Sequence, residues 1–181
     1  TSRRSFLQTM SLGAAAAGLG GVASAQETPK IQGFDEKGPE ADGSKKWEPV
    51  SDRKVRVGIV GYGTCKFGAA FSFQHHPNVE VVAVSDLFPD SCAELAKACR
   101  CEKTYPSLEE MVKDDSIEAI FLATGAPTHA RHCMEVLKHG KNVCCAVPAV
   151  WGSLEDAEKL YEAVKKSGLK YMMMETSTFH A

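Results

Sequence analysis

A glycine turn between two apolar segments is the part of this sequence best suited to do chemistry. Residues 61–65, Gly-Tyr-Gly-Thr-Cys, follow an apolar run at residues 55–60, and apolar side chains at helical spacing begin at Phe67. A second apolar run, residues 79–84, ends at Ser85-Asp86. The pattern predicts a strand, a tight turn, a helix and a second strand with a carboxylate at its end.

Each part of this unit suits one group of a bound dinucleotide. Gly61 permits a tight turn, Gly63 lets the backbone approach a pyrophosphate, and the start of the helix supplies free N–H groups. Asp86 lies 25 residues after Gly61, near the usual spacing for a carboxylate that accepts from ribose hydroxyls. We therefore predict cofactor contacts at Gly61, Gly63, Thr64, Cys65 and Asp86. The alternative is a turn whose glycines bind nothing.

The glycine spacing departs from G-x-G-x-x-G at one position. Lys66 stands where the third glycine falls, and the next glycine is Gly68. Because the third glycine serves helix–strand packing, its displacement leaves the phosphate-binding part of the turn in place.

The residues around Asp86 favour NAD over NADP. Its carboxylate would repel a 2′-phosphate, and the next residues, 87–89, are Leu-Phe-Pro and carry no cation.

Cys65 has two interpretations. It could be a thiol activated at the start of a helix, or, more simply, a small polarizable residue beside a pyrophosphate.

Composition narrows the function classes. The chain has 181 residues, 44% of them hydrophobic, and a formal net charge of −2, which fits one globular domain plus flanking segments. No broad cationic region predicts a nucleic-acid surface. Seven cysteines are too irregularly spaced for a disulfide scaffold and have no zinc-finger spacing, so we predict no metal site.

The first 25 residues have the three parts of an export signal. Arg3-Arg4 precedes a weakly apolar run at residues 10–22, and Ala23-Ser24-Ala25 forms a cleavage site. The twin arginines predict the Tat machinery as a partner and a periplasmic location for a protein exported folded. The alternatives are a Sec signal with an accidental Arg-Arg pair, or a membrane anchor. Residues 26–54 are polar, contain several Pro and Gly residues, and predict a linker.

Strands and helices alternate from residue 55 to residue 181, which predicts an α/β domain with a doubly wound parallel sheet. Ser107 and Ser153 predict helix N-caps, and residues 169–174 predict a buried last strand. A buried strand at residues 117–123 ends in a turn from Thr124 to His129. Ligands of such sheets bind beyond the strands' carboxyl ends, so Thr124 and His129 join the predicted cofactor site. The alternative for His129 is a cap on the following helix.

From Val55 onward the chain resembles the N-terminal domain of the Gfo/Idh/MocA oxidoreductases, the family of glucose–fructose oxidoreductase and inositol dehydrogenase. The likeness rests on VGIVGYG, on VVAVSD and on IEAIFLATGAPTHARHCMEVLKHGKNVCCAVP. The resemblance implies an NAD(P)-binding Rossmann domain at residues 55–181 and hydride transfer to or from a sugar or polyol hydroxyl. It adds Pro148 to the cofactor site. It also implies a C-terminal α/β domain outside these residues, so we expect the sequence to be a fragment.

One family motif is altered in a way that bears on activity. Where the family has Glu-Lys-Pro, this chain has Ala146-Val147-Pro148. The family lysine reaches toward nicotinamide and substrate, where a cation can assist proton transfer, and Val147 cannot do this. We therefore name no catalytic residue. A dinucleotide-binding protein without dehydrogenase activity and a Rossmann-like scaffold without nucleotide stay open as alternatives, as does assembly into a homo-oligomer.

Overall fold

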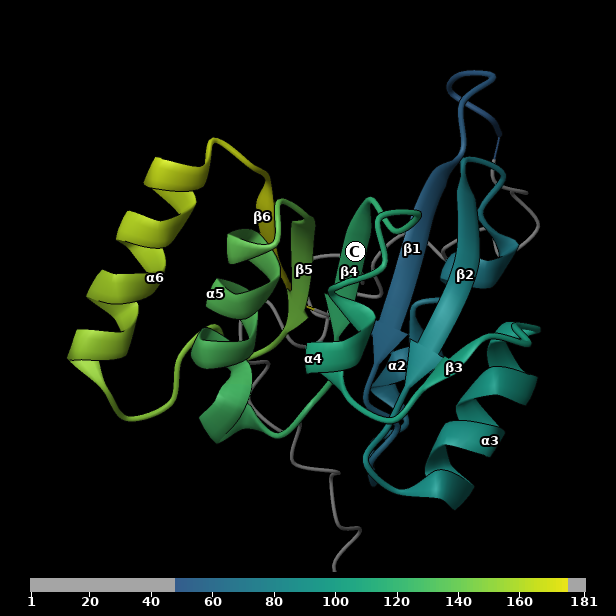
Figure 1. Ribbon diagram of the computed structural model, residues 1–181, viewed down its shortest axis with the longest axis horizontal. Coiled ribbons are helices and arrows are strands. Elements are labelled where there is room, and N and C mark those ends of the chain that lie inside the picture. Colours follow the sequence, from purple (N-terminus) through teal and green to yellow (C-terminus); the bar gives the residue numbers. More distant parts are fainter. Residues whose placement is uncertain (1–47, 176–181) are drawn as a thin grey trace, which may run out of the picture. The chain divides into compact units, whose positions relative to one another are not determined.

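The computed structural model describes residues 48–175. The predicted export signal and residues 26–47 of the predicted linker lie outside the described residues. A six-stranded sheet of order β3-β2-β1-β4-β5-β6 forms the domain, and every neighbouring pair of strands is parallel (Figure 1). The doubly wound parallel sheet predicted from the sequence is therefore confirmed.

The elements follow one another in alternation. The strands are β1 (Val55–Val60), β2 (Val79–Ser85), β3 (Thr104–Tyr105), β4 (Ala119–Leu122), β5 (Asn142–Ala146) and β6 (Tyr171–Met174). The α-helices are α2 (Phe67–Ala70), α3 (Pro89–Cys99), α4 (Leu108–Met111), α5 (His129–Lys138) and α6 (Leu154–Ser167). Two 3-10 helices, η1 (Phe73–His75) and η2 (Ala126–Thr128), complete the set within residues 48–175.

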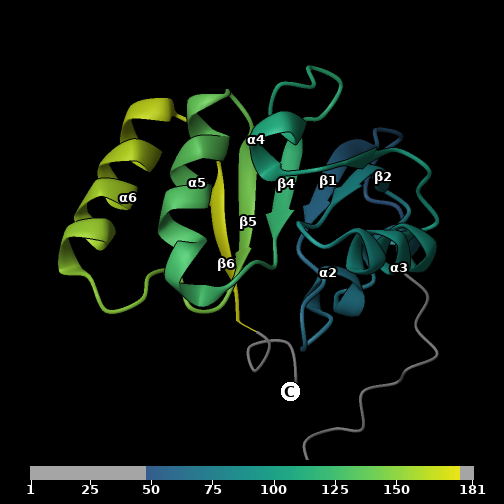
Figure 2. The ribbon, with the colours of Figure 1, turned by 60° about the horizontal axis from the view of Figure 1, so that its bottom comes forward.

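Helices cover both faces of the sheet. Figure 2 shows α4, α5 and α6 on one face and α2 and α3 on the other. Each layer closes over its own apolar core, one around Met111, Ile120 and Val136 and the other around Ile59, Leu95 and Phe121. The chain runs from β1 outward to β3 and then returns to β4 on the other side of β1. The strand order therefore reverses between β1 and β4, and a ligand crevice is expected at the carboxyl ends of these strands.

Local sequence signals set the starts of α4 and α6. The Ser107 hydroxyl accepts from the Glu110 N–H at 3.4 Å and the Ser153 hydroxyl from the Asp156 N–H at 3.1 Å, so both predicted N-caps are confirmed. The two-residue strand β3 was not predicted.

The last strand differs from its prediction. The sequence predicts buried core at residues 169–174, but Met172 and Met173 are 48% and 41% exposed. These side chains are exposed because β6 pairs only with β5 within the described residues and forms an edge of the sheet.

The end of the predicted linker is tied to the sheet. Val50 donates its N–H to the Asn78 side chain at 2.8 Å. The Asn78 amide in turn donates to the carbonyl groups of Ser51 and Arg53, each at 2.7 Å.

No helix within residues 48–175 is both long enough and apolar enough to span a membrane.

Candidate functional site

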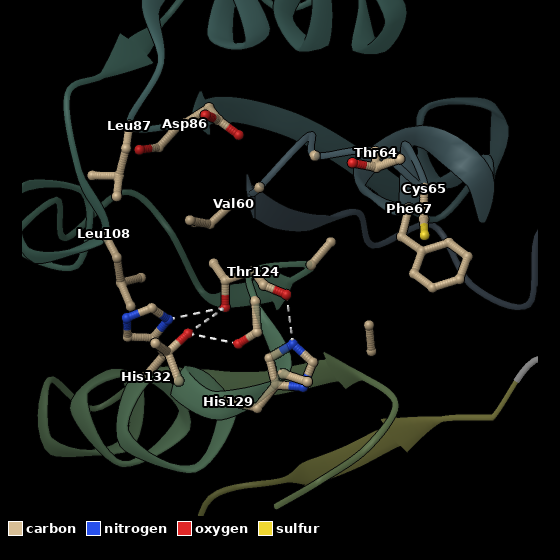
Figure 3. Close-up of a pocket in the computed structure, with 18 of the residues that line it drawn as sticks. Val60, Thr64, Cys65, Phe67, Asp86, Leu87, Leu108, Thr124, His129 and His132 are labelled. Carbon is tan, nitrogen blue, oxygen red and sulfur yellow. Dashed lines mark hydrogen bonds between the residues drawn. The ribbon is translucent and has the colours of Figure 1, made fainter. Parts of the chain in front are cut away.

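A cavity of about 570 Å³ opens at the carboxyl ends of β1, β2, β4 and β5, where the strand order reverses (Figure 3). Seven of the eight residues predicted to contact a cofactor line it, namely Gly61, Gly63, Thr64, Cys65, Asp86, Thr124 and His129. Pro148 is not among the lining residues, although its neighbour Val147 is. The topology thus gathers turns that follow four different strands around one space.

Two glycines allow the turn after β1 to pack against the rest of the sheet. Gly61 has φ +101°, and a Cβ there would lie 2.4 Å from the Ala123 carbonyl oxygen. A Cβ at Gly68 would lie 2.4 Å from the Gly61 carbonyl oxygen and 3.0 Å from a methyl group of Leu95 on α3. Gly68 therefore performs the close helix–strand packing that the third glycine of G-x-G-x-x-G normally provides.

Gly63, Thr64 and Cys65 line the cavity, and the space next to Gly63 is open. A Cβ at Gly63 would have no atom within 4 Å. Within residues 48–175 the N–H groups of Gly63, Thr64 and Cys65 have no recorded hydrogen-bond acceptor, while the Lys66 N–H closes the turn onto the Gly63 carbonyl at 2.9 Å. The expected helix is the four-residue α2, too short for a strong macrodipole. Any anion bound here is therefore held by the amides of the turn.

Asp86 connects two turns and still has capacity to bind a ligand. Its Oδ2 accepts from the Tyr62 N–H at 2.7 Å and its Oδ1 accepts from the Phe88 N–H at 2.9 Å. A carboxylate offers about four acceptor positions, so two stay available for hydroxyl groups. Ser85 lines the same wall, is fully buried, and its hydroxyl has no partner among residues 48–175.

His129 lines the cavity but uses both ring nitrogens within the protein. It is 1% exposed; Nδ1 lies 2.7 Å from the Pro148 carbonyl oxygen and Nε2 lies 2.8 Å from that of Thr124. Since a carbonyl oxygen can only accept, both bonds form together only in the imidazolium form. Burial opposes that charge, but the neighbouring Cys145 and the hydrogen bonds to the two carbonyl groups raise the pKa of His129 to about 9. His129 therefore joins the turn after β4 to the segment after β5, and Pro148 enters the site through this bond.

A polar network missed by the sequence reasoning lies beside Thr124 (Figure 3). The His132 Nε2 lies 3.3 Å from the Arg131 guanidinium, which can only donate, and Nδ1 lies 3.0 Å from the Thr124 hydroxyl oxygen. Burial, followed by the charge of Arg131, lowers the pKa of His132, so the neutral ring carries its proton on Nδ1 and donates to Thr124. The Thr128 hydroxyl lies 3.4 Å from this oxygen and donates its one proton to the Gly125 carbonyl at 2.8 Å. The Thr124 hydroxyl can therefore donate its own proton to the Thr128 oxygen or to an acceptor in the cavity.

Both Arg131 and His132 lie in the first turn of α5, directly past the end of β4. The rule that placed Thr124 in the site could therefore have found them.

The cysteines are all free thiols, and only Cys65 is exposed. Cys144 and Cys145 contribute to the cores on opposite faces of the sheet, as expected for neighbours in a strand. Within the described part of the chain, no three His, Cys, Asp or Glu side chains come together as a metal site.

The arrangement fits a dinucleotide. Open space above Gly63 and the unpaired amides suit a pyrophosphate, and Asp86 suits the adenosine ribose. The unpartnered Ser85 hydroxyl provides a further polar contact in the same wall. Near the ends of β4 and β5, Thr124 offers a hydroxyl donor, whereas Val147 offers no cation.

Comparison with known proteins places this site in a family. The model of an oxidoreductase family with an NAD-binding Rossmann fold, GFO_IDH_MocA, matches residues 55–175. A glycosyl hydrolase family 109 protein of Bacteroides thetaiotaomicron is 28% identical over 134 residues, which cover 69% of this chain and 28% of that protein. An inositol 2-dehydrogenase of Rubrobacter xylanophilus is 30% identical over 124 residues, which cover 67% of this chain and 35% of that protein.

A solved structure of a dehydrogenase also resembles this domain. The WlbA dehydrogenase of Bordetella pertussis, determined with NADH and UDP-GlcNAcA, superposes with a TM-score of 0.62 at 26% identity. The match covers 70% of this chain and 36% of that one. This chain thus spans about a third of the length of each of these three proteins.

Proposed function

Because the chain belongs to the Gfo/Idh/MocA oxidoreductase family, we propose that its Rossmann domain binds NAD in an enzyme acting on a sugar or polyol hydroxyl. The observation that carries the proposal is the open space at Gly63 in the cavity wall, beside backbone amides of residues 63–65 that have no hydrogen-bond partner within residues 48–175. A bound nicotinamide would supply the hydride acceptor or donor, and the chain's own residues would bind and orient it.

The roles of the lining residues follow from their contacts. The amides of residues 63–65 would hold the pyrophosphate, and Asp86 would accept from the ribose hydroxyls. The Thr124 hydroxyl would donate to the cofactor, with its orientation fixed by His132. His129 is a positioning residue that holds the Thr124 turn against the segment after β5. The preference for NAD over NADP rests on the negative charge of Asp86.

The substrate class is proposed from the relatives. Their names refer to an inositol, a glycoside or a nucleotide sugar, all of which present ring hydroxyl groups. Since this chain matches only about a third of those proteins, the activity of the whole protein belongs to the proposal.

A second candidate function is favoured by Val147. This side chain lines the cavity where the family carries a lysine, so neither a cation nor an acid is available from that position. A protein of this kind would retain the dinucleotide and lack dehydrogenase activity.

One experiment tests both candidates. The full-length protein, analysed by native mass spectrometry after gentle purification, should carry a mass increment that corresponds to NAD. Retention through purification requires an affinity well below micromolar, with about −12 kcal/mol for nanomolar binding. Turnover with a panel of polyols, sugars and glycosides then supports the enzyme, whereas bound NAD without turnover supports the second candidate. A cofactor-free mass that does not change on addition of NAD or NADP would contradict both.

The location is also proposed. We propose that the protein is exported by the Tat route, which suits a domain that must fold around its cofactor in the cytoplasm. Replacing Arg3 and Arg4 together with lysine should leave the precursor in the cytoplasm, measured by fractionation and immunoblotting. Unchanged export of the double variant would point to Sec or to an anchor.

A further inference from the structure

Lys66, at the position of the displaced third glycine, brings a cation into the wall of the cavity. It precedes α2 with a left-handed backbone, φ 51°, and is within electrostatic reach of Asp86. Its Nζ lies 4.2 Å from the centre of the Tyr62 ring and 2.5 Å from the Glu94 carboxylate on α3. The Tyr62 N–H in turn donates to Asp86 at 2.7 Å. Of these four residues, Lys66 and Asp86 line the cavity, and Tyr62 and Glu94 contact them from outside the lining.

The side chains of these four residues carry one net negative charge. Asp86 and Glu94 are two carboxylates, and Lys66 is the one amine among the four residues. Glu94 hydrogen-bonds the ammonium group and raises the pKa of Lys66, so the cation is held by that carboxylate. NADP differs from NAD by a phosphate on the adenosine ribose. Asp86 is placed to accept hydrogen bonds from the hydroxyl groups of that ribose. A lysine without an ion-pair partner attracts such a phosphate. A lysine paired with Glu94 attracts the phosphate less, and the Glu94 carboxylate itself repels it.

We propose that Glu94 is a specificity-determining residue, which holds Lys66 and so enforces the choice of NAD over NADP. The proposal rests on the proposed dinucleotide binding. Glu94 is outside the residues that line the cavity, so it acts through Lys66 rather than through the cofactor. The two side chains are 49% and 62% exposed, so the effect must be sensitive to salt.

Equilibrium titration of the full-length protein with NAD and with NADP at low ionic strength tests this role. In Glu94→Gln, the ratio of the NADP Kd to the NAD Kd should fall roughly five- to tenfold, because Lys66 is released and one negative charge is lost. Adding Lys66→Met to that variant should remove most of the gain. Raising the salt to about 0.5 M should shrink the change, since the charges involved are exposed.

A matched control is available on α6. Glu155 forms a somewhat more exposed ion pair with Lys159 at 2.6 Å, outside the cavity, so Glu155→Gln should leave the ratio unchanged. If the wild type prefers NAD and Glu94→Gln has the same ratio, the specificity role of Glu94 is wrong while the proposed function stands. A wild type that prefers NADP also overturns the role. If the wild type binds neither cofactor, both proposals fail.

Discussion

Replacing Gly63 with valine should abolish dinucleotide binding and leave the Rossmann domain folded. A Cβ at this position meets no atom within 4 Å, and the backbone φ is outside the left-handed region, so the fold tolerates a side chain. The empty space is where a pyrophosphate must approach the backbone, and a branched side chain would fill it. We expect the Kd for NAD to rise at least about 100-fold, or about 2.7 kcal/mol, in a calorimetric titration.

Two further variants separate binding from folding. Gly63→Ala places a smaller group in the same space and should give an intermediate loss of affinity. Gly61→Ala should instead lower the thermal unfolding temperature, because its Cβ would lie 2.4 Å from the Ala123 carbonyl oxygen at φ +101°. If Gly63→Val binds NAD as tightly as the wild type, the pyrophosphate does not lie over this turn.

Protonated His129 should contribute stability that is present at neutral pH and is lost at alkaline pH. Its pKa is raised from 6.5 to about 9 in the folded protein, so the stabilisation is fully present below pH 6.5 and is lost as the pH rises through 9. Cys145 titrates in the opposite sense over the same window and offsets part of this decline, because hydrogen bonds to Cys133 and His129 lower the pKa of its thiol in the folded protein. The groups that face the ring are the Thr124 and Pro148 carbonyls and the Cys145 thiol on β5, with His132 on the same helix.

Urea unfolding of the full-length protein at pH 6, 7.5 and 9.5 measures this dependence. His129→Gln should be less stable at pH 6 by about 2–4 kcal/mol, because two buried carbonyl groups lose a charged donor. The stability difference between the wild type and this variant should shrink as the pH rises from 6.5 to 9. His132→Gln is the matched control and should keep the pH dependence of the wild type, since the pKa of His132 is lowered and it titrates below this window. Equal slopes for the wild type and His129→Gln would contradict the imidazolium.

The sequence alone predicted the alternation of strands and helices, because apolar periodicity and capping residues act within a few positions of one another. Ser107 and Ser153 begin their helices, and a Gly-x-Gly turn follows an apolar strand, for reasons that neighbouring residues supply. The spacing from Gly61 predicted Asp86, and the rule that ligands bind beyond strand ends predicted Thr124; both line the cavity. These features needed only backbone propensity and topology.

What only the tertiary structure decided is which partner each polar side chain meets. The sequence shows Lys66 as a departure from a motif, while the fold pairs it with Glu94, 28 residues away on α3, beside Asp86. It shows His129 as a candidate ligand-binding residue, while the fold places carbonyl oxygens against both ring nitrogens. The local pattern of apolar, polar and capping residues determines the backbone conformation of a helix or strand and which of its faces is buried. Partners at long sequence separation depend on how strands and helices pack, and no short stretch of sequence encodes that packing.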